Sequence, residues 1–278
     1  MGMTGKLCLV TGSSTGIGKA TALGLAKAGA HVVLVARDSK RGEDAKADII
    51  QQSGNENVEL LLADLSTQAG VRALAADYLS RHDQLHVLIN NVGGTFKDYQ
   101  KSADGVELTM ALNYNAPFLL THLLLDTMKN SGLARIINVS SAMQANSLDI
   151  DQLLAPTHYK SMKVYGASKL AVVMFTYTLA RQLEGTTVTV NALHPGVIYT
   201  PQATRMVPPV FWPLLKLFMS SPEKGAQPSL KLATESSLEG VTGQYYNKLE
   251  HKQTSPFSND IQQQEKLYER SLAWNGLQ

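Results

Sequence analysis

Short apolar runs alternate with helical segments along almost the whole chain, and this alternation limits the fold more than any other feature. The runs predict buried parallel strands at residues 6–10, 31–36, 57–62, 86–90, 134–139 and 187–192, with a short seventh at 243–246. Periodic segments between them predict helices at 19–27, 38–52, 66–82, 103–129, 164–183, 222–234 and 260–274. We therefore expect an α/β fold, a doubly wound Rossmann-type parallel sheet of about seven strands with helices on both faces.

Composition narrows the class of protein further. Neither a repeat nor a Gly/Ser-rich linker divides the 278 residues, so we expect a single domain over residues 1–278. The net charge is +2 without a basic run, which gives no footprint for nucleic-acid binding. Cys8 is the only cysteine, so we expect no disulfide within the chain and no metal site. No secretory leader and no run of roughly 20 apolar residues is present, so a cytoplasmic protein is expected.

A glycine-rich stretch, TGSSTGIG at residues 11–18, lies between the first predicted strand and the first helix. A strand, a glycine turn and a helix N-terminus present backbone N–H groups to a phosphate. The glycines are Gly12, Gly16 and Gly18, in the order G-x-x-x-G-x-G rather than the common G-x-G-x-x-G. Taken alone the stretch also fits a turn that is rich in glycine for steric reasons only.

Tyr165 and Lys169 stand one helical turn apart on the same face of a predicted helix. A neighbouring cation favours the phenolate and would bring the tyrosine pKa towards the working range of an acid–base catalyst. Ser141 ends the fifth predicted strand, so it is expected at the same carboxyl edge of the sheet, where its hydroxyl can hold a substrate oxygen. A turn or cap residue is the alternative for Ser141, and two unrelated helix residues are the alternative for the pair.

Together with several other motifs, these residues resemble the short-chain dehydrogenase/reductase family over almost the whole chain. The matching motifs are residues 11–18, Asp64-Leu65, Asn90-Asn-Val-Gly93, Asn113, Ser141, Tyr165-x-x-x-Lys169 and Pro195-Gly196. The retinol-dehydrogenase-like branch is the most similar, on LLT at 119–121, HPGV at 194–197, SPEKGA at 221–226 and GQYY at 243–246.

The resemblance implies a role for each matching residue. Tyr165 would be the general acid in carbonyl reduction and the general base in alcohol oxidation. Lys169 would hold the nicotinamide ribose and lower the tyrosine pKa. Ser141 would orient the substrate oxygen, and Asn113 would hold a water of the proton relay. Asn90 would steady its strand beside the cofactor. The implied cofactor-binding residues are Gly12, Ser14, Thr15, Gly16, Ile17, Gly18, Arg37, Asp64, Leu65, Asn91, Gly93, Tyr165, Lys169, Pro195, Gly196, Val197, Ile198 and Thr200.

Structural alternatives stay open for three of these residues. Asn90 could cap backbone groups of its strand, and Asn113 could satisfy a neighbouring carbonyl inside a helix. Asp64 could cap the following helix, a role for which Ser66 competes.

The cofactor is expected to be NADP(H) rather than NAD. An acidic residue after the second strand would accept from the 2′-hydroxyl of NAD, whereas this chain has Arg37, which fits a 2′-phosphate bidentately. Asp38 weakens this argument slightly but can instead cap the next helix, and Arg37 can be read as a solvated surface residue.

Two departures from the family pattern bear on the site. Val92 replaces the usual alanine and adds bulk near the adenosine ribose. Ser141 and Tyr165 are 24 positions apart, a longer gap than the wider family shows, and the insert with Asp149, Asp151 and His158 is expected to form one wall of the substrate site.

Residues 201–221 are rich in proline and large apolar side chains, and we interpret them as a substrate lid; a subunit contact and an interfacial membrane contact are the alternatives. The leading hypothesis is an NADP(H)-dependent oxidoreductase that interconverts a carbonyl and an alcohol on an apolar small molecule such as a retinoid, steroid, lipid aldehyde or xenobiotic ketone. A non-catalytic dinucleotide-binding regulator or scaffold is the alternative. Homo-oligomers are common in the family, with the last helix or the helices at 103–129 and 164–183 as candidate interfaces.

Overall fold

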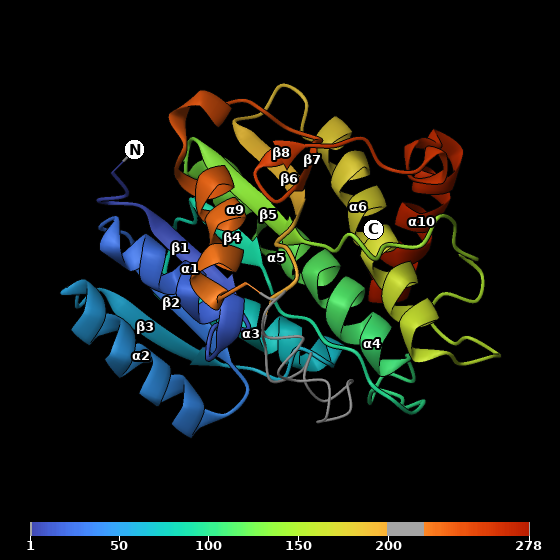
Figure 1. Ribbon diagram of the computed structural model, residues 1–278, viewed down its shortest axis with the longest axis horizontal. Coiled ribbons are helices and arrows are strands. Elements are labelled where there is room, and N and C mark those ends of the chain that lie inside the picture. Colours follow the sequence, from blue (N-terminus) through green and yellow to red (C-terminus); the bar gives the residue numbers. More distant parts are fainter. Residues whose placement is uncertain (1, 199–219, 278) are drawn as a thin grey trace.

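The computed structural model describes residues 2–198 and 220–277 and contains an eight-stranded sheet in the order β3-β2-β1-β4-β5-β6-β7-β8 (Figure 1). The strands are β1 Leu7–Thr11, β2 His31–Ala36, β3 Val58–Leu62, β4 Val87–Asn90, β5 Ala134–Val139, β6 Val188–His194, β7 Tyr245–Asn247 and β8 Glu250–His251. All neighbours pair in parallel except β8, which runs antiparallel to β7. The predicted doubly wound sheet is confirmed, with one more strand than expected. The strand order reverses at β1, which lies between β2 and β4, so the ligand crevice of such folds is expected there.

The described helices are α1 Gly16–Lys27, α2 Ser39–Ser53, α3 Gln68–Arg81, α4 Leu108–Met110, the π-helix η1 Ala111–Asn115, α5 Ala116–Asn130, α6 Ser161–Gln182, α9 Pro222–Thr234 and α10 Ile261–Asn275. Two 3₁₀ turns, η3 Ser236–Leu238 and η4 Pro256–Asn259, lie in the last third. None of the helices described here combines the length and the apolar character that crossing a bilayer requires.

Helices cover both faces of the sheet, because the side chains of each strand alternate between them. Cys8 and Val10 of β1 pack in one core with α1, α2 and α9, which lie in front of the sheet in Figure 1. Leu9 of the same strand points the other way, into a larger core that contains α3, α5 and α6. Burial raises the pKa of the Cys8 thiol to about 12, as for an inert core residue.

The helix expected over residues 103–129 was wrong at its start and in its middle. Gly105 adopts φ +80° in a turn, and the Glu107 carboxylate accepts from the backbone N–H of Met110 at 2.9 Å, so the helix begins only at Leu108. It then widens into the π-helix η1, which contains Asn113, before α5 continues it. A π-turn inside a helix often marks a functional site.

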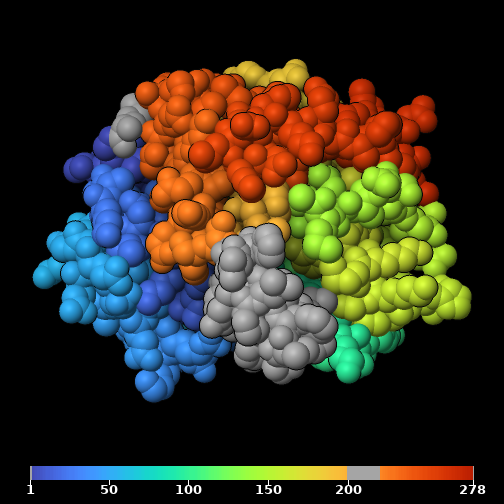
Figure 2. Space-filling model, in the orientation of Figure 1, coloured from blue at the N-terminus to red at the C-terminus, as the bar shows by residue number. Residues whose placement is uncertain are grey.

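The last helix, α10, packs against α6 and α5. Tyr268 Oη lies 2.7 Å from His122 Nε2 on α5, and the Arg181 guanidinium of α6 donates to Glu265 at 2.6 Å. Residues from α9 to α10 form a continuous orange-to-red band along one rim of the face shown in Figure 2. The helices proposed from the sequence as subunit interfaces, α5, α6 and α10, therefore contact one another within the chain. Only their outer faces could contact a partner subunit.

Candidate active site

The carboxyl ends of β1, β4, β5 and β6 carry most of the predicted site residues. The glycine loop follows β1, Asn91 to Gly93 follow β4, Ser141 follows β5, and Pro195 and Gly196 follow β6. Parallel strands bring these segments to one edge of the sheet, which is where the alternation of strands and helices placed them.

The loop after β1 adopts a shape that favours glycine at three positions. Gly12 has φ +65° and Gly16 has φ +58°, both in the left-handed region. A Cβ on Gly18 would collide with the side-chain amide of Asn91 and with the carbonyl oxygen of Gly12. The loop backbone therefore turns tightly and lies close against β4, as a phosphate-binding turn requires.

Asn91 fastens this loop to the end of β4. Its Nδ2 donates to the carbonyl oxygens of Thr11 at 2.9 Å and Gly12 at 3.2 Å. In the other direction, Thr11 Oγ1 accepts the backbone N–H groups of Asn91 and Val92, each at 3.0 Å. The hydrogen bonds of Asn91 thus shape the loop, and its direct contact with a cofactor stays a prediction.

The N-terminus of α1 differs from those of four other helices. The side chains of Asp38, Thr67, Ser221 and Asp260 cap α2, α3, α9 and α10 by accepting backbone N–H groups. Thr15, at the corresponding position of α1, makes no such bond, and no acidic residue lies in the first turn. The helix end is therefore open, and the space beside Gly18 would be filled by a Cβ. Both features fit the pyrophosphate of a dinucleotide. Ser14, Thr15, Gly16 and Ile17 are the residues that would surround it.

Arg37 and Asp64 emerge from neighbouring strands, since the last residues of β2 and β3, Ala36 and Leu62, pair in register. Asp38 Oδ1 accepts from the Arg41 N–H at 2.8 Å, so Asp38 caps α2, the alternative that the sequence analysis gave for it. Arg37 is exposed, and within residues 2–198 and 220–277 no acidic side chain forms an ion pair with it.

The cap of α3 is Thr67, which accepts from Gly70 N–H at 3.0 Å, so both Asp64 and Ser66 were wrong as candidates for that role. Asp64 instead accepts from the backbone N–H of Ser66 at 3.0 Å and from its hydroxyl at 2.7 Å. The Asp64 side chain is exposed, whereas Leu65 is buried in the core beside α3. Asp64 is therefore the member of this pair that is free to face a ligand.

Tyr165 and Lys169 lie one turn apart on α6, as predicted. The Lys169 ammonium is 5.8 Å from the centroid of the Tyr165 ring and donates to the carbonyl oxygen of Val139, the last residue of β5, at 2.8 Å. The side chain is almost fully buried, and this desolvation lowers the pKa of Lys169 to about 8.

Burial has the opposite effect on the phenol. It raises the pKa of Tyr165 above its ordinary value, and a hydrogen bond with Ser141 opposes that effect. The expected lowering by Lys169 is therefore not what the structure gives. A raised pKa keeps the phenol protonated, which is the state a general acid needs.

Ser141 and Tyr245 form a contact that the sequence did not reveal. Ser141 is buried, and its Oγ accepts from Met143 N–H at 3.1 Å. The Tyr245 hydroxyl, from β7, donates to the Ser141 carbonyl oxygen at 3.1 Å. The sequence predicted a short strand and a family motif at 243–246, but the two partners are 104 positions apart, so no local pattern indicates the contact.

The Asn113 side chain holds the segment after β4 in place. Its Oδ1 accepts from Gly94 N–H at 2.7 Å, and its Nδ2 donates to Gly94 O at 2.9 Å and to Ser168 Oγ at 3.0 Å. A Cβ on Gly93 would lie 3.2 Å from Asn113 Oδ1 and 3.4 Å from Lys169 Nζ, so Gly93 borders the Lys169 ammonium. The structural role anticipated as an alternative is present, and the water-holding role stays a prediction.

Asn90 belongs to a buried chain of polar side chains across the sheet. Its Nδ2 donates to Thr121 Oγ1 at 3.0 Å and to Asn138 Oδ1 at 2.9 Å. Asn138 Nδ2 in turn donates to Thr176 Oγ1 at 2.9 Å. These bonds join β4 and β5 to α5 and α6, so Asn90 stabilises its strand.

The segment after β6 turns back against the glycine loop. Gly196 has φ +100°, Val197 is exposed and Ile198 is buried, forming an isolated bridge with Ser220. A Cβ on Gly225 of α9 would touch both Ile198 and Ile17, which shows how closely the three elements approach. Thr200 and residues 201–219 lie outside the described residues.

The insert between Ser141 and Tyr165 is tied to α10. Asp151 pairs with Lys266 at 2.8 Å and with Arg270 at 2.5 Å, and these cations hold the pKa of the carboxyl below its usual range. Asp149 closes a local turn by accepting from Asp151 N–H at 3.0 Å, and His158 is exposed. Asp151 thus attaches the insert to α10, and Asp149 stabilises a turn within the insert.

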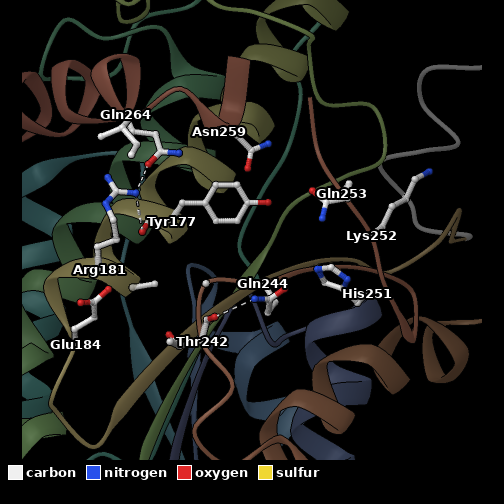
Figure 3. A pocket seen from close by; sticks show the side chains of 13 residues that line it. Tyr177, Arg181, Glu184, Thr242, Gln244, His251, Lys252, Gln253, Asn259 and Gln264 are labelled. Carbon is white, nitrogen blue, oxygen red and sulfur yellow. Dashed lines mark hydrogen bonds between the residues drawn. The ribbon is translucent and has the colours of Figure 1, made fainter. Parts of the chain in front are cut away.

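A polar cavity of about 460 Å³ lies away from Tyr165, between α6, β8 and the start of α10 (Figure 3). Tyr177, Gln244, His251, Lys252 and Gln264 are among its lining residues. Its polar lining differs from the apolar site that the sequence predicted beside residues 201–221.

Comparison with known proteins agrees with this geometry. Residues 6–209 match the model of the short chain dehydrogenase family. Retinol dehydrogenase 13 of Homo sapiens is 39% identical over 287 aligned positions, which cover 99% of this chain and 86% of that protein. Retinol dehydrogenase 12 of Homo sapiens is 37% identical, with 99% and 88% covered.

Among solved structures, L-sorbose reductase from Gluconobacter frateurii, complexed with NADPH and L-sorbose, superimposes with a TM-score of 0.74 at 27% identity, covering 90% of this chain and 98% of that one. The resemblance drawn from the motifs is thereby confirmed. This chain belongs to the short-chain dehydrogenase/reductase family of oxidoreductases, in its retinol-dehydrogenase-like branch.

Proposed function

We propose that the protein is an NADP(H)-dependent oxidoreductase that interconverts an alcohol and a carbonyl group on an apolar small molecule, with Tyr165 as its general acid and base. The observation that carries the proposal is the grouping of Tyr165, Lys169 and Ser141 at the sheet edge that also holds the glycine loop. Retinoids, steroids, lipid-derived aldehydes and xenobiotic ketones are the candidate substrates.

Each side chain has a distinct task in this proposal. Ser141 Oγ orients the substrate oxygen by hydrogen bonding. The protonated Tyr165 phenol, kept neutral by burial, donates its proton to that oxygen in reduction and accepts one in oxidation. The nicotinamide, when bound, supplies or accepts the hydride. Lys169 is held by Val139 O beside the tyrosine, where it can contact a ribose hydroxyl and pass protons.

Arg37 supports the preference for NADP(H). The Asp38 carboxylate accepts from Arg41 N–H, so it is directed to the N-terminus of α2 as a helix cap. The exposed guanidinium of Arg37 then provides a bidentate partner for the phosphate at the end of β2. The sorbose reductase with a similar fold was solved with NADPH.

The apolar substrate class rests on the sequence and on the relatives. Residues 201–221 contain Phe211, Trp212 and Phe218, and the two human relatives are named for retinol, a largely hydrocarbon alcohol. With NADPH as the bound form, reduction is the expected direction.

The test measures NADPH and NADH binding first and then NADPH consumption with a panel of aldehydes and ketones that spans retinal, a steroid ketone, a medium-chain aldehyde and a sugar. Turnover that favours the apolar members and NADPH supports the proposal. A protein that binds NADPH tightly but turns over no member of the panel is the non-catalytic regulator instead.

A further inference from the structure

We propose a binding site for a divalent transition metal, formed by His31, Glu59 and His82 at the edge of the sheet opposite the active site. His31 Nε2 lies 2.6 Å from one carboxylate oxygen of Glu59, and His82 Nε2 lies 3.3 Å from the other. The three donor atoms all lie within 4.8 Å of one another. Two imidazoles thus point the same ring nitrogen at one carboxylate.

Three separate elements bring these residues together. His31 is the first residue of β2, and Glu59 lies on β3 opposite Val33. Because side chains alternate along a strand, His31 and Val33 face the same side of the sheet, and so does Glu59. His82 is the C-cap that directly follows α3, the helix that covers this side. No sequence spacing announces such a site, which explains why no metal site was expected.

The rings are held in fixed orientations. The His31 and His82 rings meet edge to face, with centroids 5.5 Å apart and planes at 87°. The Tyr78 ring packs 4.9 Å from His82, and the Tyr78 hydroxyl is anchored by donating to Gln84 O at 2.7 Å. Such supporting contacts orient imidazole ligands before a metal arrives.

Burial is intermediate, so an ion can enter without crossing the core. The side chains of His31, Glu59 and His82 are 33%, 31% and 12% exposed. His31 and His82 line a cavity of about 350 Å³ that Asn57 and Asp83 also line. A water molecule from this cavity can complete a four-coordinate site.

The donor chemistry selects the class of ion. Two imidazole nitrogens with one carboxylate suit Zn²⁺ and its neighbours Co²⁺, Ni²⁺ and Cu²⁺, whereas Mg²⁺ and Ca²⁺ prefer oxygen ligands only. At metal–ligand distances of about 2.0–2.2 Å, the donors of a tetrahedral site stand roughly 3.4 Å apart. His31 Nε2 and the nearer Glu59 oxygen, now 2.6 Å apart, would therefore separate by roughly 0.8 Å, which side-chain rotation can supply. The ion would displace the protons that the His–Glu hydrogen bonds now hold.

The location indicates a structural role. β2 has six residues, so at about 3.3 Å per residue its first residue lies roughly 17 Å from the strand end that precedes Arg37. A metal here is too far from Tyr165 to touch the reacting atoms. It would fasten the edge strand β3 to β2 and to the end of α3, raising thermal stability while leaving turnover unchanged.

The experiment titrates the full chain, freed of any affinity tag and stripped of metal, with Co²⁺ followed by visible absorption and with Zn²⁺ followed by calorimetry. We expect one equivalent to bind, with the absorption of four-coordinate Co²⁺ and a higher melting temperature. His31→Gln, Glu59→Gln and His82→Gln should each weaken binding at least about tenfold. His251→Gln, an exposed histidine on β8, is the matched control and should bind like the wild type.

Circular dichroism without metal checks that each variant is folded, and three separate substitutions keep the test decisive if one of them is not. Absence of saturable binding overturns the proposal, as does binding that survives all three substitutions. Neither readout involves turnover, so the outcome is independent of the proposed oxidoreductase activity.

Discussion

The Lys169 ammonium donates to the carbonyl oxygen of Val139 at 2.8 Å from a position that is only 4% exposed. The bond joins α6 to the end of β5, next to Ser141. Burying the amine lowers its pKa to about 8, because the charged form is less stable in the protein interior than in water. At neutral pH the amine is nevertheless charged, so the folded protein contains a buried charge. Such a residue reduces stability while it serves the site.

Replacing Lys169 by Met should therefore abolish turnover and yet stabilise the fold. Removing the buried charge should gain about 1–3 kcal/mol at pH 7 in urea unfolding, after about 1 kcal/mol is lost with the bond to Val139 O. The sign of the pH dependence follows from the lowered pKa. Between about pH 8 and the unfolded value near 10.5, the unfolded chain binds more protons, so wild-type stability rises with pH. The advantage of Lys169→Met should shrink across that window; a constant or growing advantage would contradict the assignment.

Tyr165→Phe removes the proposed proton donor and little else. Turnover should fall by about 10²–10⁴-fold, because the substrate oxygen loses its general acid, while dinucleotide affinity stays nearly unchanged. Steady-state kinetics and NADPH fluorescence measure the two effects. Tyr177→Phe is the matched control: it lies on the same helix, and its hydroxyl is 2.8 Å from Thr254 Oγ1. Unaltered turnover in Tyr165→Phe would refute the proposed mechanism.

Gly18→Ala should weaken dinucleotide binding by more than about tenfold, a change of at least 1.4 kcal/mol. The added methyl group would push against Asn91 and the Gly12 carbonyl, the contacts that shape the loop. Gly24→Ala places the same methyl on the same helix, where it meets only the flexible end of Leu230. Calorimetric titration with NADP should separate the two variants, and equal affinities would show that the loop is not the phosphate cradle.

Arg37→Ala should lower affinity for NADPH by about tenfold or more and leave NADH affinity unaffected, because only NADPH carries the 2′-phosphate. Lys40→Ala is the control; Lys40 is exposed and already paired with Asp44 at 3.0 Å. The ratio of the two dissociation constants is the quantity to compare. If it does not move in Arg37→Ala, the discrimination lies in another residue.

Tyr245→Phe tests the positioning of Ser141. Loss of the hydrogen bond to the Ser141 carbonyl should lower kcat about tenfold through misplacement of the serine, with little change in NADPH affinity. Tyr246→Phe alters the next residue on β7, whose side chain packs in the core on the other side. A matching loss of kcat in both variants would point to general loosening of β7 and against a role for Tyr245.

The sequence predicted elements best where one local pattern decides them. The bounds are as expected for β2 at His31–Ala36, β5 at Ala134–Val139 and α9 at Pro222–Thr234. The two strands are short segments rich in β-branched and apolar residues, and the helix begins with a serine cap and a proline. The helix around Asn113 was misjudged because its break depends on the Gly105 turn and on bonds to Gly94, which tertiary structure supplies.

The site shows the same division. Motif order placed Tyr165, Lys169 and Ser141 at one edge, because topology alone fixes which strand ends meet. The upward shift of the Tyr165 pKa and the Tyr245 contact depend on burial and on distant partners. The His31–Glu59–His82 cluster and the attachment of Asp151 to α10 also join residues that are distant in the chain, so no local pattern predicts them.

The bonds from Asn91 to Thr11 and Gly12 join residues that are about 80 positions apart in the chain. A nascent chain that ends before Asn91 already contains every glycine of the loop but lacks the side chain that fastens it. The loop can reach its final shape only after β4 has docked beside β1, so closing that long stretch of chain must precede dinucleotide capture. Cofactor binding therefore comes late in the folding of each newly made chain. A fragment limited to the first βαβ unit would not form the binding loop.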